Sequence, residues 1–372
     1  MSLLHYIYLV IFNLPRNNED AEDIYHKNGF LITHLLSQVR IGMDLSRILL
    51  PTFILENRSL LEMYADFLAH TDFFISIAQQ KSPQDRMIAV LKWYVSSFHT
   101  AWDVKTAKKP YNPILGEFFE CSYKCDETTK SDQVYFISEQ ISHHPPVSAF
   151  YAESCENHIY IEGHIWTKSK FYGLSVGVDL IGGATIYLKE FNEHYKISFP
   201  SAFAKSILTV PTVEIGGDVK IVCQETNYKS KISFHLKPFY GGSRHRVSAK
   251  ISNMTTNKSF YILDGYWNSV FSGKRVHLNT NHFVFDTKNC NTHKKIIKKV
   301  SQQKPNESRN LWKNVTKALY RNDIALATQH KFGLEQIQRE EASYRKTNSI
   351  KWFPKYFTKE ADGWVSYINK MS

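Results

Sequence analysis

The 372-residue chain contains no run of about 20 uninterrupted apolar residues, the length that an α-helix needs to cross a bilayer. Its five cysteines include no C-x-x-C pair, and no histidines stand at zinc-finger spacing, so neither a disulfide framework nor a structural metal site is expected. The patterns G-x-x-x-x-G-K-S/T and G-x-G-x-x-G are also missing, and no G-x-S-x-G elbow is recognisable: the match at residues 173–177 stands among strand-like alternating residues and does not open a helix. The sequence therefore argues against nucleotide-dependent chemistry and against a hydrolase of the G-x-S-x-G type, and it predicts no cofactor.

The most apolar stretch stands at the start of the chain. Residues 1–14 (MSLLHYIYLVIFNL) have the apolar run of a secretory signal peptide, but no Lys or Arg precedes the run and no small-residue cleavage pattern stands before Pro15. An odd number of cysteines without a pairing pattern also fits a reducing compartment. We therefore expect a cytoplasmic protein, and we assign residues 1–27 to an acidic and apolar extension for which the pattern indicates no role.

Composition favours a β-rich globular protein. Hydrophobic residues make up 43% of the chain and charged residues 22%, and the 14% of aromatic residues favour pleated, half-buried surfaces on which flat rings pack well. Residues 288–372 hold 18 basic and 7 acidic side chains, an excess equal to the +11 net charge of the whole chain. Such a region is typical of one that faces an anionic partner. Nucleic acid, lipid headgroups, a phosphorylated ligand and a merely solvated helix face all remain open.

The spacing of apolar residues divides the chain into helical ends and a β-rich middle. It predicts an amphipathic helix over 30–41, a further apolar run at 44–51 and a helical block over about 59–102. From 116 to 286 the pattern changes to short alternating runs, punctuated by glycine pairs that we interpret as turns, at 182–183, 216–217 and 241–242. Successive strands without helices between them indicate one large antiparallel sheet, curled or closed into a barrel wide enough to hold a ligand.

The basic C-terminal region is predicted to return to helix over about 294–368. Asp323 is expected to cap a helix in which Lys331, Glu335 and Arg339 follow one another at intervals of four residues. Side chains at this interval are expected to lie in one row along the helix. The alternative interpretation is a ladder of surface salt bridges, each worth only about 0.3–0.5 kcal/mol.

The most specific pattern is EQISHHPP at residues 139–146. Neighbouring histidines on a plain strand point to opposite faces, but the two following prolines let the chain turn, so that His143 and His144 can address one point. Two imidazoles that donate hydrogen bonds suit an oxyanion such as phosphate. Zinc is the alternative, yet adjacent histidines chelate one ion poorly and no nearby Asp, Glu or Cys completes a three-ligand set. We expect an anion site and no metal.

A second pattern, KKPYNPILGE at residues 108–117, places lysines at the junction between the helical block and the sheet. No catalytic triad is recognisable. A wide aromatic barrel with Lys and His donors at its mouth is typical of binding rather than turnover, so we expect no enzyme activity.

Both patterns resemble those of a known family. EQISHHPP is similar to the signature of the oxysterol-binding protein family, and KKPYNPILGE is similar to the other hallmark of its lipid-binding domain. The similarity continues through residues 49–67, 165–173 and 237–246, and it extends roughly over 28–368. Within the family, the sequence is most similar to the subgroup of related proteins nine, ten and eleven.

The resemblance implies the architecture of one lipid-binding domain over residues 28–368. This fold is mainly β with flanking helices: a large near-closed antiparallel β-barrel, here about 111–287, encloses a tunnel for one lipid. An N-terminal lid over about 28–51 would close the tunnel, and C-terminal helices would complete the headgroup site. The lid would include Leu35, Ile48 and Leu49.

The resemblance also implies ligands and a site. Phosphatidylinositol 4-phosphate is the shared ligand of the family, and by motif position its headgroup would be held by seven residues: Lys109, Asn112, His143, His144, Lys331, Glu335 and Arg339. Ser169 matches a position that contacts the headgroup in phosphatidylserine-binding relatives. The implied activity is exchange of phosphatidylinositol 4-phosphate for phosphatidylserine or sterol, by a protein that associates peripherally with endoplasmic-reticulum, Golgi or endosomal membranes at contact sites.

Several alternatives stay open at this point. The acidic two-phenylalanine tract at 117–121 resembles a receptor-docking motif of the family, but its place in the barrel segment predicts a strand, so no contact-site receptor is identified. A lipid sensor that binds without transporting and a hydrolase or metalloenzyme that uses His143 and His144 are the rival hypotheses. A nucleic-acid binder is disfavoured because the basic region lacks interleaved aromatic residues on a sheet platform.

Overall fold

The computed structural model describes residues 55–101, 109–125, 133–172, 175–205, 212–238, 241–278, 283–360 and 363–368. The expected lid, with Leu35, Ile48 and Leu49, lies outside these residues, as does the expected helix at 30–41. None of the helices in the described ranges is both long and apolar enough to cross a bilayer.

The predicted helical block is confirmed. It consists of α3 (Leu60–Tyr64), the 3-10 helix η3 (Ala65–Leu68), α4 (Thr71–Ser76) and α5 (Pro83–Ala101). Helix α5 begins where the sequence predicts, because the Ser82 hydroxyl accepts the backbone N–H of Asp85 at 3.1 Å and Pro83 opens the first turn. Before α3, the strand β1 (Leu55–Ser59) pairs in parallel with β2 (Lys109–Tyr111).

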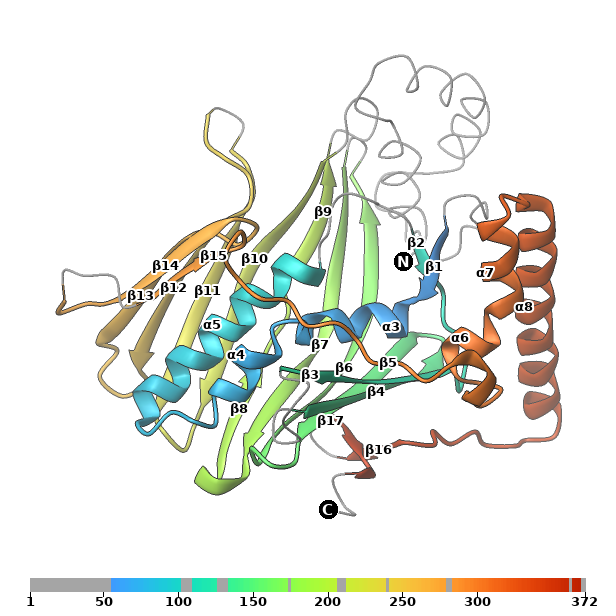
Figure 1. Ribbon diagram of the computed structural model, residues 1–372, viewed down its shortest axis with the longest axis horizontal. Helices are drawn as coiled ribbons and strands as arrows, with labels where there is room; N and C mark the ends of the chain where they lie inside the picture. The colour runs from blue at the N-terminus through green and yellow to red at the C-terminus, as the bar shows by residue number, and fades with distance from the viewer. Residues whose placement is uncertain are drawn as a thin grey trace.

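The middle of the chain forms one antiparallel sheet, in which thirteen strands lie within the described residues (Figure 1). Most strands pair with their neighbours in sequence. The strands are β3 (Phe118–Lys124), β4 (Gln133–His143), β5 (Pro146–Ser154), β6 (Ile159–Phe171), β7 (Ser175–Leu188), β8 (Glu193–Ile197), β9 (Ser201–Lys205), β10 (Thr212–Cys223), β11 (Tyr228–His235), β12 (Arg246–Asn253), β13 (Ser259–Tyr266), β14 (Val270–Arg275) and β15 (Phe283–Asp286).

The sheet curls without joining its two ends. Within the described residues β15 and β3 are not paired with each other, and helices α3 to α5 lie across the opening (Figure 1). Residues 288–307, here called the crossing segment, run from β15 to β3. Ser122 of β3 exchanges backbone hydrogen bonds with Ile296 at 3.0 and 2.8 Å. The backbone N–H of His293 donates to the Ala69 carbonyl at 2.8 Å. The predicted large antiparallel sheet is therefore confirmed, with helices and one extended segment completing its wall.

The glycine pairs at 182–183 and 216–217 are not turns, and that prediction is wrong. They lie inside β7 and β10, where the partner of each strand changes between β9 and β8. Gly182 has a φ of +123°, and a Cβ there would stand 2.1 Å from the His164 carbonyl oxygen. Glycine permits the bend and the close approach of the neighbouring strand, so the pairs mark bends within long strands.

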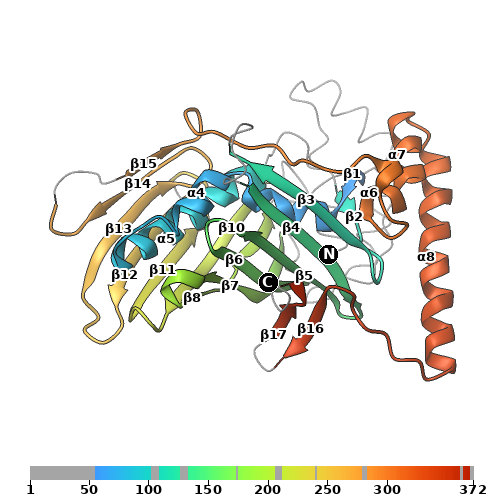
Figure 2. The same ribbon diagram turned by 60° about the horizontal axis from the view of Figure 1, so that its bottom comes forward.

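The C-terminal region is only partly helical, which corrects the prediction for 294–368. Apart from η6 (Val300–Gln302), its helices are α6 (Ser308–Leu311), α7 (Lys313–Tyr320) and α8 (Ile324–Thr347), and the chain then forms a hairpin of β16 (Phe357–Glu360) and β17 (Gly363–Ser366) (Figure 2). The predicted cap is confirmed, because the Asp323 side chain accepts the Leu326 N–H at 3.0 Å.

Among the described residues, three hydrophobic clusters hold these layers together. The largest packs α3 to α5 against the strands, as Val90 and Leu91 meet residues such as Ile232. A second joins the β16–β17 hairpin to β4, β5 and β6. The third includes Tyr111 and Trp312, whose rings stack at 4.6 Å, and it fixes α6 to α8 beside β1 and β2.

Candidate functional site

A line of hydrogen bonds joins the two most specific sequence patterns to helix α8. The backbone N–H of Leu115 donates to Gln338 Oε1 at 2.8 Å, and Gln338 Nε2 lies 2.8 Å from Nε2 of His143. His143 Nδ1 in turn lies 3.1 Å from Nε2 of His144. The predicted meeting of the two imidazoles therefore occurs in the β4–β5 turn, next to the C-terminal helix.

The donor and the acceptor of each bond in this line can be assigned, starting from the N–H of Leu115. A backbone N–H can only donate, so Gln338 must present its oxygen to Leu115 and its amide N–H to His143. His143 then accepts at Nε2, carries its proton on Nδ1 and donates to His144. The relay leaves the remaining ring N–H of the exposed His144 as a donor at its outer end.

Electrostatics also keeps His143 neutral. Burial, followed by the charge of His144, lowers the pKa of His143 from its ordinary value of 6.5 to about 4, although Glu335 acts in the opposite direction. A neutral ring with one donor matches the relay. The charge of Glu335, the acidic member of the predicted row, is thus near enough to act on His143.

This lowered pKa predicts how stability changes with pH. Between pH 6.5 and 4 the unfolded chain protonates this histidine and the folded protein does not, so stability should fall as the pH falls through this range. For one extra proton bound by the unfolded chain, the free energy of unfolding changes by at most about 1.4 kcal/mol per pH unit. Solvent screening at this partly exposed ring reduces that slope. His143→Asn should flatten the curve of unfolding midpoint against pH below 6.5, whereas His158→Asn at an exposed turn should not. Parallel curves for wild type and His143→Asn would contradict the assignment.

The buried carboxylate of Glu117 stabilises the loop from Asn112 to Gly116. Glu117 has no exposed surface and accepts from the hydroxyl of Ser308 at 2.7 Å, from Trp312 Nε1 at 2.9 Å and from the backbone N–H of Ile114 at 3.1 Å. The Ser59 hydroxyl supplies a fourth bond. Burial raises the pKa of Glu117 and these donors act against the rise. The carboxylate thus fixes the loop that carries Leu115.

Helix α8 does not present Lys331, Glu335 and Arg339 in quite the expected way. Lys331 and Glu335 form an ion pair of 2.7 Å, but Arg339 is exposed and donates to Gln336 at 3.0 and 3.1 Å. At about 100° per residue, a position seven residues on is turned only about 20° from Lys331, whereas the position eight residues on is turned about 80°. Gln338 therefore reaches the histidines and Arg339 faces away from them. The seven-residue spacing could have revealed Gln338 in the sequence.

The remaining predicted site residues lie apart from the relay. Lys109 belongs to β2, and its side chain lies outside the described residues; Asn112 is exposed in the following loop. Ser169 is buried in β6, between the exposed Lys168 and Lys170. It lies three residues beyond Trp166, which pairs with Val147 at the start of β5, and so it is at the same end of the sheet as the histidine turn.

Two residues of the EQISHHPP pattern stabilise neighbouring backbone segments, a role that the sequence did not indicate. Glu139 is buried and accepts the backbone N–H groups of Lys355 and Tyr356, both at 2.8 Å, which fixes the approach to the β16–β17 hairpin. Gln140 accepts from the Ser148 hydroxyl at 2.6 Å and donates to the Ser142 carbonyl at 2.8 Å, across the bulge in β4. The pattern thus combines the half-buried His143 and the exposed His144 with the residues that position their turn.

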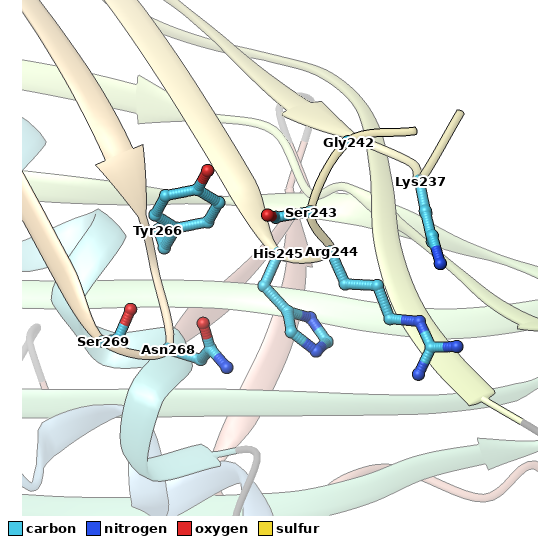
Figure 3. Close-up of a pocket in the computed structure, with 8 residues that line it drawn as sticks. All are labelled: Lys237, Gly242, Ser243, Arg244, His245, Tyr266, Asn268 and Ser269. Atoms are coloured by element: carbon cyan, nitrogen blue, oxygen red, sulfur yellow. The ribbon is translucent and has the colours of Figure 1, made fainter. Parts of the chain in front are cut away.

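The segment 237–246 builds a separate basic depression of about 570 Å³, shown in Figure 3. Lys237 and Arg244 come from the β11–β12 connection, and Tyr266 and Asn268 lie across from them. Strands β10, β8, β7 and β6 stand between β11 and β5 in the sheet. The depression is therefore distinct from the histidine turn.

Comparison with known proteins decides the family. The sequence profile described as oxysterol-binding protein matches residues 34–320. The chain belongs to this family. It is 48% identical over 365 residues to mouse (Mus musculus) oxysterol-binding protein-related protein 9, covering 94% of this chain and 50% of that protein. It is 43% and 42% identical to the human (Homo sapiens) related proteins 11 and 10, over 94% and 95% of this chain and 50% of each of those proteins. The predicted subgroup is confirmed, and the chain spans about half the length of these relatives.

Solved structures confirm the fold of this family member. The Osh1 ORD domain in complex with cholesterol is similar with a TM-score of 0.73 at 25% identity, over 91% of this chain and 86% of that chain. The Osh3 ORD of Saccharomyces cerevisiae in complex with PI(4)P is similar with a TM-score of 0.70 at 22% identity, over 90% and 89%. The chain is thus a member of a lipid-binding family with that family's β-rich fold.

Proposed function

We propose that this protein binds phosphatidylinositol 4-phosphate and exchanges it for a second lipid between membranes, without catalysing a reaction. The observation that carries the proposal is the relay from Leu115 through Gln338 to His143 and His144. It joins the KKPYNPILGE segment, the histidine turn and helix α8, which are distant in sequence, and this supports a headgroup site there. An arriving phosphate would accept from the free ring N–H of His144, with Lys331 about two turns from Gln338 along α8.

A phosphate headgroup alone does not explain extraction from a bilayer. Each methylene of an acyl chain that leaves the bilayer for water costs about 0.8 kcal/mol, so the chains need an enclosed apolar space. The curled sheet with its apolar inner face is the part of the structure suited to that role. The proposed lid at 28–51 would close it, and PI(4)P in the Osh3 structure supports this lipid as the occupant.

The second lipid is proposed to be phosphatidylserine or a sterol. Ser169 and Thr167 are buried on one face of β6 near the histidine turn, where hydroxyl groups suit the polar headgroup of phosphatidylserine. Cholesterol and ergosterol in two Osh1 structures support a sterol instead. We favour phosphatidylserine because the rim donors required by phosphatidylinositol 4-phosphate also serve a second phospholipid.

The outer surface of α8 and the residues after it suit contact with a membrane. Ile337 and Tyr344, seven residues apart on one face of α8, and Phe353 after the helix expose between 54% and 68% of their surface. Exposed apolar side chains of this kind favour an interfacial environment, and the surrounding basic residues favour anionic headgroups. We propose that the protein docks peripherally on membranes with this side.

The test is a transfer assay between two vesicle populations. Donor vesicles contain labelled phosphatidylinositol 4-phosphate, and acceptor vesicles contain labelled phosphatidylserine, sterol or neither. Exchange predicts that phosphatidylinositol 4-phosphate moves faster when the acceptor contains the second lipid, and that this lipid moves in the opposite direction. Acceleration by phosphatidylserine alone or by sterol alone identifies the partner.

Two results would contradict parts of this proposal. Extraction of phosphatidylinositol 4-phosphate without delivery to the acceptor would favour the sensor that binds without transporting. No extraction of this lipid at all would remove the headgroup assignment, whatever the second lipid does.

A further inference from the structure

Three metal-binding side chains from distant parts of the chain meet beside the crossing segment. His70 directly precedes α4, His99 lies in the last turn of α5, and Cys290 lies in the crossing segment; one ligand atom of each is within 4.8 Å of the other two. His70 Nε2 and His99 Nδ1 are 3.4 Å apart. This spacing is that of a weak hydrogen bond between the two rings, and it also equals the roughly 3.3–3.4 Å between two ligands that are each about 2.0–2.1 Å from one tetrahedral zinc ion.

His70 is oriented as a metal ligand. Its Nδ1 lies 2.9 Å from the carbonyl oxygen of Asn291, and because a carbonyl can only accept, Nδ1 carries the proton. Nε2 then presents its lone pair toward His99. Ligating histidines typically donate their other ring N–H to a carbonyl or a carboxylate in this way. The rings of Phe73 and Phe285 pack against His70 at 5.4 and 5.5 Å and hold its plane.

Asp72 and His293 form a long ion pair beside the cluster. Asp72 Oδ1 and His293 Nε2 have no hydrogen-bond partner among the described residues, and they lie 3.7 Å apart. Both residues act electrostatically on His70. Buried polar atoms are rarely left unsatisfied. A metal-bound water in this place would donate to Asp72.

We propose that His70, His99 and Cys290 bind a zinc ion, with water as the fourth ligand. Two imidazoles and a thiolate are donors that zinc prefers, and the thiol proton of Cys290 would pass to solvent on binding. The ion would tie α4, α5 and the crossing segment together at the opening between β15 and β3. The site has a structural role, independent of the proposed lipid exchange.

The experiment uses the full chain, produced without a polyhistidine tag and purified without chelator. Elemental analysis should find about one zinc ion per chain. Cobalt(II) added to the metal-free protein should give tetrahedral absorption bands and a thiolate-to-cobalt charge-transfer band. Cys290→Ser and His99→Ala should each weaken zinc binding by more than the roughly 10–100-fold that loss of an outer-sphere partner costs. The charge-transfer band should vanish in Cys290→Ser.

The matched control is Cys155→Ser, which changes an exposed cysteine outside the cluster. It should keep both the zinc and the cobalt spectrum. A chelator should lower the unfolding temperature of wild type and of Cys155→Ser but not that of Cys290→Ser, which keeps the proposal testable if the variant is less stable. Folded wild-type protein without zinc and without a cobalt charge-transfer band would overturn the proposal, as would an unchanged zinc affinity in Cys290→Ser.

Discussion

Replacing His143 and His144 together by alanine should reduce extraction of phosphatidylinositol 4-phosphate at least about 10-fold. The double change removes the free ring N–H of His144, and a charge-assisted hydrogen bond from this donor to a phosphate is worth about 1.5–3 kcal/mol, which is at least one factor of ten in affinity. The measurement is the fraction of labelled lipid removed from vesicles as protein concentration rises. Because His144 is exposed and His143 only half-buried, the fold should be kept.

A matched control separates the headgroup role from a loss of histidines in general. His158 is exposed and His194 half-buried, as His144 and His143 are, and the strand register places them at the opposite end of the sheet from the β4–β5 turn. Their double alanine variant should extract the lipid as wild type does. Unaltered extraction by the His143 and His144 variant would exclude these residues from the headgroup site.

Replacing Glu117 by alanine should lower the free energy of unfolding by about 3–4 kcal/mol. The change leaves the buried Trp312 indole N–H and the Ile114 N–H without their acceptor, whereas the Ser308 hydroxyl can still donate to the Phe118 carbonyl, and each orphaned buried group costs about 1–3 kcal/mol. This loss is a large part of the roughly 5–15 kcal/mol that stabilises a typical domain. Urea unfolding followed by tryptophan fluorescence measures it.

Two further variants test the mechanism of that loss. Glu117→Gln keeps one acceptor oxygen but turns an amide N–H toward a donor, so its effect should be intermediate. Glu156→Ala, at an exposed turn, should change the stability by less than about 0.5 kcal/mol. Equal stability of Glu117→Ala and wild type would show that the four donors find other acceptors.

The helical block and the strands could be predicted because their signals are local. The helix start at Ser82 and Pro83 and the alternation of apolar residues along the strands depend only on near neighbours. The glycine pairs were wrongly predicted as turns because glycine occurs both in turns and at bends within strands. Only the change of the pairing partner from β9 to β8 distinguishes a bend from a turn here. The C-terminal hairpin was missed because its anchors, such as Glu139, come from distant strands.

The sequence motifs predicted part of the candidate site. The pairing of His143 and His144 followed from the prolines, but Gln338 was missed because the interval of four residues drew attention to Arg339. The positions of Lys109 and Ser169 relative to the headgroup stay predictions. No spacing rule joins His70 and His99, 29 residues apart, to Cys290, because only the fold brings them together.

The crossing segment has a consequence for the order in which the chain is completed during synthesis. Most strand pairs link near neighbours, so the sheet can grow hairpin by hairpin as the chain emerges. Helices α3 to α5 are synthesised before the sheet. Their apolar surface is covered only after strands such as β11 and residues 288–307 have also been synthesised. Until the ribosome has released those last segments, the nascent protein carries an uncovered hydrophobic interior, the kind of surface that chaperones recognise.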